Sequence, residues 1–532
     1  MKLTKMKVVV VLLILSLVLT VFAGCGGAES TEGEPAEVDL LTMIISSGPV
    51  YDWDPAIMFS TDNLILCNMY ETLLRYNPET DEYMPLLATE FSSNEDGTVW
   101  TFKIREGVKF HDGTDLNAEA VKFSIDRVID MKMGASYIWS AVESINVIDE
   151  YTVEFVCKYP SDIAMMASCT YGAFIISPTA AGTDNAAATE WFSAGNECGT
   201  GPYMLESQVP NDEVLMTAFE DYWGGWEDNQ YDKVLVKVIS ENSSRRQMIE
   251  SGEADIGQGF NLTDIKALTE NENLKIYTTE AYQARAAHFN TVKPPLNNVT
   301  LRKALAYAWP YEDVVEYVWG NEFASVPTDF IPKTMWGSNQ ESPYYYDLDK
   351  AAELLAEAGY PDGSGLTIKY YYVSGSDNFR KMAEMYKSEL AKIGVTLELQ
   401  SVTWDTLVSL HRESNVANQP DISAFMLWAE IPSPSAWYQC AVLTEEKPYF
   451  NQSHYSNPEV DKMINDAIMY TGIDKEKAAS LFKQVGQQIA EDCIAIYQTD
   501  DKQVTVANKE VKGAITGNKA YPSVIFFYDC YK

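Results

Sequence analysis

The chain has 532 residues, of which 46% are hydrophobic and 12% aromatic, so it can bury a large core. At roughly 100 to 200 residues per domain, this length predicts at least two folded domains. The formal net charge is −38 at pH 7, and a surface this acidic repels nucleic acid and anionic membranes. Composition therefore predicts a globular, multidomain protein and argues against nucleic-acid binding.

The first residues have the layout of an export signal. Three lysines precede an uncharged apolar run at residues 8–23, which ends just before Cys25. The run is shorter than the roughly 20 apolar residues of a membrane span, so residues 1–24 read as a signal peptide rather than a retained anchor. "VFAGC" resembles the bacterial lipobox, although Phe22 stands where Leu is usual, and this implies a lipid on Cys25. The polar residues 25–37 predict a flexible tether. The alternative is plain secretion with an unmodified cysteine.

From residue 38 onward, the first half of the chain predicts short strands with interspersed helices. Alternating apolar residues at 100–110 indicate a strand pair, and the next apolar positions lie on one face of a helix capped by Asn117. "INVIDEYTVEFVC" indicates a hairpin that turns at Asp149. Further on, an alternating strand at 234–238, a helix ending at Gly252 and the strand "ADIGQGF" indicate a βαβ unit.

Residues 301–500 hold most of the predicted helices, and three strands alternate with them: "LTIKYYYV", "VTLELQSV" and "DISAFMLW". This alternation predicts an α/β domain with a largely parallel sheet. In open α/β sheets, ligands bind in the crevice beyond the carboxyl ends of the strands. The three loops that follow these strands would bring Trp404 and Trp428 close to a carboxylate, Glu430, and a guanidinium, Arg380. The chain then ends in the strand-like segments "KQVTVAN" and "PSVIFFYDCY".

The sequence carries no motif typical of catalysis. Its four histidines are isolated in sequence, and H-E-x-x-H, a P-loop, a G-x-S-x-G elbow and a full G-x-G-x-x-G are all missing. His111-Asp112-Gly113 looks like a dyad, but between a strand and a helix we interpret it as a turn in which His111 hydrogen-bonds locally. Seven cysteines besides Cys25, without C-x-x-C spacing, argue against a disulfide-built scaffold and leave the disulfide pattern open.

Several segments occur in a fixed order over more than four hundred residues. They are "PLLATEF" with "DGTVWTFKIREGVKFHDGTDLNAEAVKFSIDRV", then "GTGPYML", "EDYWGG", "SGEADIG", "HFNTVKPPLNNVTLRKALAYAW", "AAELLAEAGYPDG" and "HYSNPEVDKMINDA". No single one of these motifs is decisive, but their order is specific. From about residue 38 to its end, the chain thereby resembles the family 5 extracytoplasmic solute-binding proteins of ABC importers, which include dipeptide-, oligopeptide- and nickel-binding proteins.

The resemblance implies an α/β, two-lobed periplasmic-binding-protein-like (type II) fold with a hinge and an extra N-terminal subdomain in lobe I. The chain would cross between the lobes near residues 281–290 and 497–505. The implied parts are lobe I at 38–287, with its extra subdomain at about 70–200, lobe II at 288–503, and C-terminal strands at 504–532 that return to lobe I.

The resemblance also implies ligand-binding residues. In peptide-binding relatives, an Asp shortly after a strand-ending Trp or Cys holds the ligand's α-amino group; here "LWAEIPSP" has Glu430 in that place and Ile431 where Tyr is frequent. Glu keeps the charge, although it could instead cap the following turn. Trp404 matches a pocket-lining Trp of many relatives, with a core position as the alternative. The remaining candidates are Trp428, Arg380, Tyr51 in "SSGPVYDWDP", Tyr282 near the first crossing and Tyr171 in "CTYGAF".

The function implied is reversible capture of a short peptide by lobe closure, without catalysis, cofactor or protein-bound metal, and delivery to an ABC permease and its ATPase. We expect a monomer, extracytoplasmic and held to the cell membrane through Cys25. Two alternatives stay open: binding of a metal chelate or other non-peptide solute, and a peptide-sensing receptor lipoprotein without import.

Overall fold

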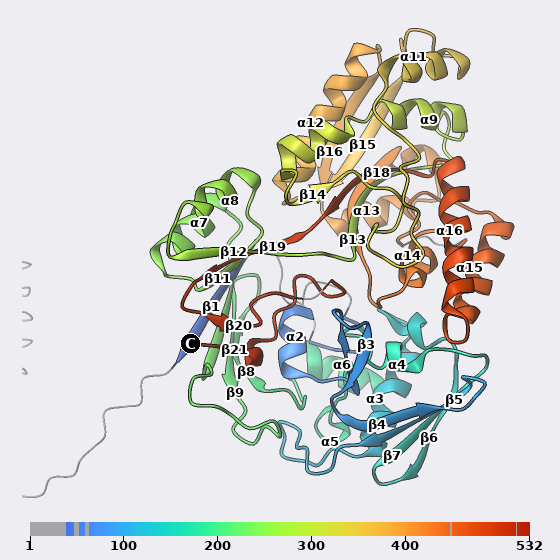
Figure 1. Cartoon of the computed structure of the whole chain (residues 1–532). Coiled ribbons are helices and arrows are strands. Elements are labelled where there is room, and N and C mark those ends of the chain that lie inside the picture. Colours follow the sequence, from blue (N-terminus) through green and yellow to red (C-terminus); the bar gives the residue numbers. More distant parts are fainter. Residues whose placement is uncertain (1–38, 47–52, 59–62, 447–448, 518) are drawn as a thin grey trace, which may run out of the picture. The chain divides into compact units, whose positions relative to one another are not determined.

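The computed structural model describes residues 39–46, 53–58, 63–446, 449–517 and 519–532 (Figure 1). The predicted signal peptide and tether, the lipidation site Cys25 and the candidate Tyr51 lie outside these ranges. Within the described ranges, the structure has no helix long and apolar enough to cross a membrane.

A seven-stranded mixed sheet organises lobe I. Its central strand β1 (Leu40–Ile45) runs parallel to its two neighbours, β10 (Lys233–Val238) and β11 (Ile256–Gln258). Helix α7 (Asn242–Ser251) connects those two strands and ends at Gly252, whose φ of 76° is left-handed, so the predicted βαβ unit is confirmed with β1 inserted between its strands. The full order is β12 (Leu274–Thr279), β19 (Gln503–Asn508), β11, β1, β10, β9 (Glu213–Ala218) and β8 (Tyr203–Val209), and helix α8 (Leu262–Thr269) follows β11.

A four-stranded antiparallel sheet lies within the predicted extra subdomain. Its order is β4 (Ala88–Ser93), β5 (Val99–Ile104), β7 (Thr152–Cys157) and β6 (Val142–Asp149). The hairpin of β6 and β7 turns after Asp149, as predicted, and the Asn117 side chain caps helix α3 (Ala118–Met131) by accepting from the Ala120 N–H at 3.0 Å. The smaller elements of lobe I are α2 (Asn63–Met69), β2 (Leu74–Asn77), β3 (Glu82–Pro85), η1 (Ser136–Trp139), α4 (Ile163–Met166), α5 (Pro178–Ala181) and α6 (Asn185–Ser193).

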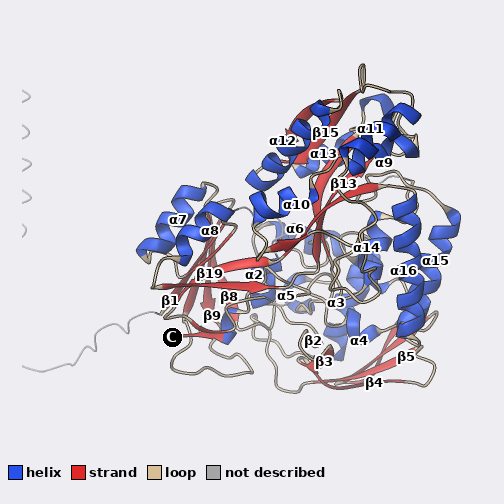
Figure 2. Cartoon of the chain, turned by 45° about the horizontal axis from the view of Figure 1, so that its top comes forward, coloured by secondary structure: helices blue, strands red, loops and turns tan. Residues whose placement is uncertain are grey.

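Lobe II is built on a six-stranded sheet with helices on both faces (Figures 1 and 2). The strand order is β14 (Ala324–Ser325), β18 (Ala495–Asp501), β13 (Gln283–Phe289), β17 (Ile422–Trp428), β15 (Thr367–Val373) and β16 (Thr396–Val402). Only β15 pairs in parallel, with β16 and β17. The prediction of a largely parallel sheet is therefore wrong for β14, β18 and β13, which run antiparallel to their neighbours. Two of these strands, β13 and β18, connect directly to lobe I.

Two groups of helices cover the faces of this sheet. Buried residues of α9 (Val299–Tyr307), α11 (Leu348–Glu357) and α12 (Asp377–Lys392) share one cluster with Phe289 and Ile422. Those of α15 (Pro458–Thr471) and α16 (Lys475–Glu491) share another with Phe425 and Tyr497. The other elements are α10 (Tyr311–Val314), the π-helical turn η2 (Val315–Trp319), α13 (Trp404–His411), η3 (Val416–Asn418) and α14 (Pro434–Ala441).

The chain passes between the two sheets twice, and one carboxylate joins both passages. Residues 280–282 connect β12 to β13, and Lys502 connects β18 to β19. The six-stranded sheet thus begins at Gln283, before the predicted start of lobe II at residue 288. At the end of β18, the buried Asp501 accepts from Gln283 Nε2 at 2.9 Å and pairs with Arg285 of β13. The two passages are therefore fixed to each other.

The C-terminal segment differs from the prediction. Only Cys530–Tyr531 (β21) of "PSVIFFYDCY" is a strand, paired with β20 (Lys512–Gly513), while Phe527–Asp529 forms the turn η4. The reason is a buried side chain of α2: Asn68 Nδ2 donates to the Ile525 carbonyl at 2.9 Å, and its oxygen accepts from the Phe527 N–H at 2.8 Å. These bonds take the place of a strand partner.

A buried ion pair in lobe I gives a stability prediction. Arg127 of α3 donates to both carboxylate oxygens of Asp54 at 2.5 Å, and the two side chains are 1% and 0% exposed. Arg127→Ala leaves a buried carboxylate without its cation, so we expect a loss of about 3–5 kcal/mol in unfolding free energy, measured by urea denaturation. Lys122→Ala, which breaks the exposed pair with Asp126 on the same helix, is the control and should cost about 0.5 kcal/mol. Equal losses for the two variants would contradict the prediction.

Candidate functional site

The end of strand β17 in lobe II meets lobe I at Glu430. This residue lies two positions after β17 and is 3% exposed. Its Oε2 accepts a hydrogen bond from the Tyr137 hydroxyl at 2.7 Å, and its main-chain carbonyl accepts one from the Cys169 thiol at 2.7 Å. Tyr137 belongs to η1, and Cys169 follows α4, so both donors come from lobe I. The candidate carboxylate therefore lies at the contact between the lobes.

The Glu430 carboxyl is surrounded by weak acids. Burial raises its pKa to about 7, and the Tyr137 hydrogen bond offsets part of that rise. The titratable groups around it are the Tyr137 and Tyr171 phenols and the Cys169 and Cys440 thiols, whose pKa values are raised by burial and further by the Glu430 charge. Among the described residues, no Lys, Arg or His forms an ion pair with Glu430. The carboxylate thus lacks a cationic partner from this part of the chain.

Two predicted aromatic residues lie beside this carboxylate. Trp428, the last residue of β17, is half-buried and is near enough to the Tyr171 hydroxyl to lower the pKa of that phenol. Tyr171 is itself buried, and the Glu430 charge raises its pKa. The structure therefore brings Tyr171 to Trp428 and Glu430, although Tyr171 comes from a distant part of the sequence.

Tyr282 occupies the first passage between the sheets. Its N–H donates to the Lys519 carbonyl at 2.6 Å, and its own carbonyl accepts from the Ala429 N–H at 3.0 Å, next to Glu430. The Lys519 amino group lies over the Tyr282 ring, 5.4 Å from its centroid. The side chain is 2% exposed, so Tyr282 joins the passage to the strand end that carries the carboxylate.

Trp404 and Arg380 lie at the ends of the neighbouring strands. Trp404 starts α13 and packs on Phe425 and Phe450, with ring centroids 5.2 and 5.6 Å away. Arg380 is 46% exposed and pairs with Asp377 at 2.5 Å and Glu384 at 2.9 Å, both on its own helix α12. Trp404 thus belongs to an aromatic group of lobe II, whereas the charge of Arg380 is already matched locally.

His111 does not bond locally as the sequence suggested. Its Nδ1 lies 2.7 Å from Glu197 Oε2 and its Nε2 lies 2.8 Å from the Gly201 carbonyl, in a buried position. Asp112 makes the expected turn, accepting from the Thr114 N–H at 2.9 Å. In the described part of the chain, no group of three or more His, Cys, Asp or Glu side chains is arranged to hold a metal ion. The seven cysteines of that part are free thiols.

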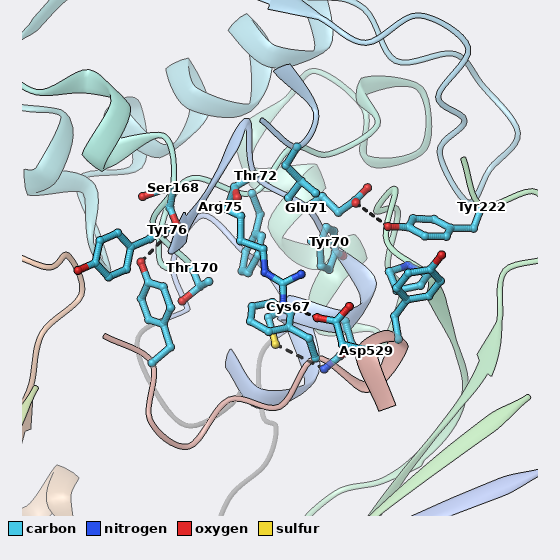
Figure 3. Close-up of a pocket in the computed structure, with 17 residues that line it drawn as sticks. Cys67, Tyr70, Glu71, Thr72, Arg75, Tyr76, Ser168, Thr170, Tyr222 and Asp529 are labelled. Atoms are coloured by element: carbon cyan, nitrogen blue, oxygen red, sulfur yellow. Dashed lines mark hydrogen bonds and ion pairs between the residues drawn. The ribbon is translucent and has the colours of Figure 1, made fainter. Parts of the chain in front are cut away.

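A small cavity of about 50 Å³ lies in lobe I, and Glu430 is not one of the residues that line it (Figure 3). Arg75 faces it and pairs with Asp529 at 2.6 Å, and the buried Glu71 accepts from the Tyr222 hydroxyl at 3.0 Å. Ser168 and Thr170 line it, whereas Cys169 between them bonds the Glu430 carbonyl. This short segment therefore separates the cavity from the carboxylate site.

Sequence reasoning missed Tyr137, Cys169 and Cys440. Tyr137 follows Gly134 in an irregular segment, "MGASYIW", without periodicity or a spacing that marks a site. Its role depends on the approach of residues that are 293 positions apart. Tyr137 can therefore be identified as a candidate site residue only from the contact between the lobes in the folded structure.

The protein has two α/β lobes, which are joined by two passages of the chain and meet at a buried acidic group. This arrangement defines a two-lobed ligand-binding protein of the type II periplasmic class. The model of the bacterial extracellular solute-binding proteins, family 5 (Middle), matches residues 82–449. The chain belongs to this family, whose members are substrate-binding transport proteins.

Similar proteins cover nearly the whole chain. "Probable D,D-dipeptide-binding periplasmic protein DdpA" of Escherichia coli K12 is 25% identical over 469 residues, 87% of this chain and 89% of that protein. Glutathione-binding protein GsiB of Salmonella typhimurium LT2 is 26% identical over 437 residues, 80% of this chain and 82% of its own length. The structure of DppA from Helicobacter pylori in complex with the peptide STSA has a TM-score of 0.80 and 25% identity, and the match covers 92% of this chain and 98% of that one.

The raised pKa of Glu430 predicts a pH-dependent stability. The folded state holds the Glu430 proton up to about pH 7, whereas the ordinary pKa is 4.5, so the contribution of Glu430 to the stability of the wild type falls as the pH rises between these two values. Glu430→Gln removes the titration, and the variant should gain about 3 kcal/mol relative to the wild type between pH 4.5 and pH 8. Thermal unfolding of ligand-free protein at pH 5 and pH 8 measures this gain. Glu384→Gln, at an exposed position, should change stability equally at both pH values; the same behaviour of Glu430→Gln would refute the prediction.

Proposed function

We propose that this protein is the substrate-binding lipoprotein of an ABC importer, which captures short peptides between its lobes and delivers them to a permease and its ATPase. The observation that carries the proposal is the buried Glu430 carboxylate at the contact of the lobes, without an ion-pair partner among the described residues. A buried charge is costly unless it is paired. The ammonium group of a peptide supplies that partner in a charge-assisted hydrogen bond.

The remaining candidates take supporting roles in this proposal. Trp428 and Tyr171 lie next to Glu430 and provide apolar surface for the first residue of the ligand. Trp404, Tyr282, Tyr51 and Arg380 are proposed to line the rest of an extended ligand, with Arg380 exchanging its local partners for a ligand carboxylate. Main-chain hydrogen bonds would hold the extended peptide, so that binding depends only weakly on the identity of its side chains.

The names of several relatives support a peptide ligand. DdpA is named as D,D-dipeptide-binding, GsiB as glutathione-binding, and the Helicobacter pylori protein was solved with a bound peptide. All three ligands are short and contain peptide-like bonds. In the proposed mechanism, binding shifts the population from open to closed lobes, and no bond is made or broken.

The proposed location follows from the N-terminal residues. Signal peptidase would remove residues 1–24, and a lipid on Cys25 would hold a monomeric protein at the outer face of the membrane through the polar tether. Mass spectrometry of the mature protein tests this part separately, because a diacylated cysteine changes the mass of the first residue.

Native mass spectrometry of the purified protein tests the ligand class. Because closure buries the ligand, we expect retained endogenous peptides, seen as a ladder of masses above that of the protein. A single bound metal chelate or other non-peptide solute would overturn the proposal and favour the alternative ligand class. Product formation from added peptides would show catalysis instead of transport.

Removing the charge of Glu430 should weaken the capture of an amino terminus. For Glu430→Gln we expect a loss of roughly 2–5 kcal/mol in binding free energy of a free dipeptide such as Ala-Ala, measured by calorimetry. The matched ligand control is the N-acetylated dipeptide, which lacks the ammonium group and should bind wild type and variant equally weakly. Unchanged affinity of the variant for the free dipeptide would exclude this role of Glu430.

A further inference from the structure

A groove of about 640 Å³ lies within lobe II. Its lining residues come from α9, from the segment 328–344, from α16 and, at Tyr497, from β18. Because all of them belong to one lobe, the groove does not depend on how the two lobes are arranged. Small-molecule sites measure about 300–1,000 Å³. The groove is therefore large enough to take a small molecule, and Glu430 is not among the residues that line it.

The buried Asp329 fixes the segment 328–344 to α16. Its carboxylate accepts from the Phe330 N–H at 2.7 Å, and from the N–H and the side-chain amide of Asn339 at 2.6 and 2.8 Å. Gly486, inside α16, gives these groups room, because a Cβ there would meet Asn339 Nδ2 and Asp329 Oδ1 at 2.6 Å. The two sides of the groove are thus held together, so its shape is set before a ligand arrives.

Tyr497 supplies the groove with a hydroxyl that has no partner. The residue is 4% exposed, and its hydroxyl makes no hydrogen bond to any described part of the chain. The hydroxyl of Tyr344, which also lines the groove, is by contrast satisfied by the Ala490 carbonyl at 2.6 Å. Because buried polar groups are normally hydrogen-bonded, the Tyr497 hydroxyl points to a polar ligand.

The charged residues of the groove balance each other. Lys303 and Lys483 carry two positive charges, and Glu341 and Glu491 carry two negative ones. The charge of the buried Asp329 carboxylate is met by its three N–H donors. The groove therefore gives little preference to an anion or a cation and favours a neutral, polar ligand.

The other polar side chains are amides and hydroxyls. Asn339, Gln340 and Gln487 contribute amides, and Thr328 and Ser342 contribute hydroxyls. Each of these groups can both donate and accept a hydrogen bond. This set suits a ligand that carries several hydroxyl groups, since a hydroxyl also donates and accepts.

Tyrosine rings border these polar groups. Tyr307 lines the groove, and its ring centroid lies 5.4 Å from those of Tyr344 and Tyr345, with both rings edge-on to it. Tyr345 is 57% exposed. A sugar ring has faces of C–H groups and a rim of hydroxyls, so it packs on an aromatic ring while its rim forms hydrogen bonds. The groove combines both requirements.

We propose that this groove of lobe II binds a neutral saccharide of one or two units, as a second site separate from Glu430. In this site, the Tyr497 hydroxyl and the Gln487 amide form hydrogen bonds with sugar hydroxyls, and Tyr307 packs on a sugar face. The proposal goes beyond the proposed function and does not rest on it.

An array of neutral mono- and disaccharides, probed with the purified protein, tests the ligand class. We expect binding to a subset that shares one sugar configuration, because fixed hydrogen-bonding groups select among hydroxyl orientations. Binding to none of the neutral saccharides would overturn the proposal. Binding to charged glycans alone would overturn it as well, since the charges of the groove are balanced.

Calorimetry with the saccharide that binds best on the array tests the residues. Tyr497→Phe should weaken its binding about three- to tenfold, which corresponds to one hydrogen bond. Tyr307→Ala should weaken it at least as much, because the packing ring is lost. The control Tyr317→Phe alters a ring that is 63% exposed and outside the groove, and it should bind like wild type. Equal affinity of wild type and both groove variants would contradict the proposal.

Thermal unfolding without saccharide separates binding from folding. The Tyr497 hydroxyl has no hydrogen-bond partner among the described residues, so Tyr497→Phe should unfold at the wild-type temperature or above it. A clear decrease would show that the hydroxyl stabilises the fold itself and would refute its role in the groove.

Glu430→Gln separates the groove from the proposed peptide site. Loss of saccharide binding in this variant would place the sugar at Glu430 and overturn the second site. Binding of Ala-Ala tests the proposed function independently, and Tyr497→Phe should leave it unchanged. Saccharide binding without Ala-Ala binding would support the groove and contradict peptide capture, whereas Ala-Ala binding alone would do the reverse.

Discussion

Asp501 joins the two passages on which the relation of the lobes depends. It ends β18, and it is bonded by Gln283 and Arg285 of the adjacent strand β13. The Arg285 guanidinium also lies over the Trp319 ring, 4.3 Å from its centroid, which adds a cation–π contact to this pair. Because both chain passages leave lobe II from this one anchored place, rotation of a lobe has to be taken up by the few residues beyond it, residues 280–282 and Lys502.

This constraint determines where the lobes can meet. Strand β17 lies beside β13, so its end and the following Glu430 are held close to the first passage, through the Tyr282–Ala429 bond. In the structure, Tyr137 and Cys169 of lobe I both donate hydrogen bonds to Glu430 beside this passage. The structure thus buries an ionisable carboxyl where the lobes meet, and in the proposed function a ligand that neutralises this carboxyl would recover the cost of its burial.

Much of the fold could be predicted from the sequence because its local signals agree with the tertiary structure. The Asn117 cap, the hairpin at Asp149 and the helix end at Gly252 are short-range features, and the structure has each of them. The predictions that were wrong depended on distant partners. The C-terminal segment that was predicted as a strand hydrogen-bonds to the Asn68 side chain instead. His111 hydrogen-bonds to Glu197 rather than to its sequence neighbours. The same holds for the site: a strand-end position suggested Glu430, but Tyr137 had no local signal because its partner is 293 residues away.

Lobe I is built from two stretches of the chain, one before lobe II and one after it, and this affects the order in which the lobes can fold after export. In the seven-stranded sheet, β12 touches the rest of the sheet only through β19, which lies beyond all of lobe II in the chain. Residues 283–501, by contrast, contain every strand of their own sheet. Emerging from the secretion channel, lobe II can therefore be complete while lobe I still exposes the edge of β11, and unpaired edges of this kind invite misassociation until the last thirty or so residues arrive.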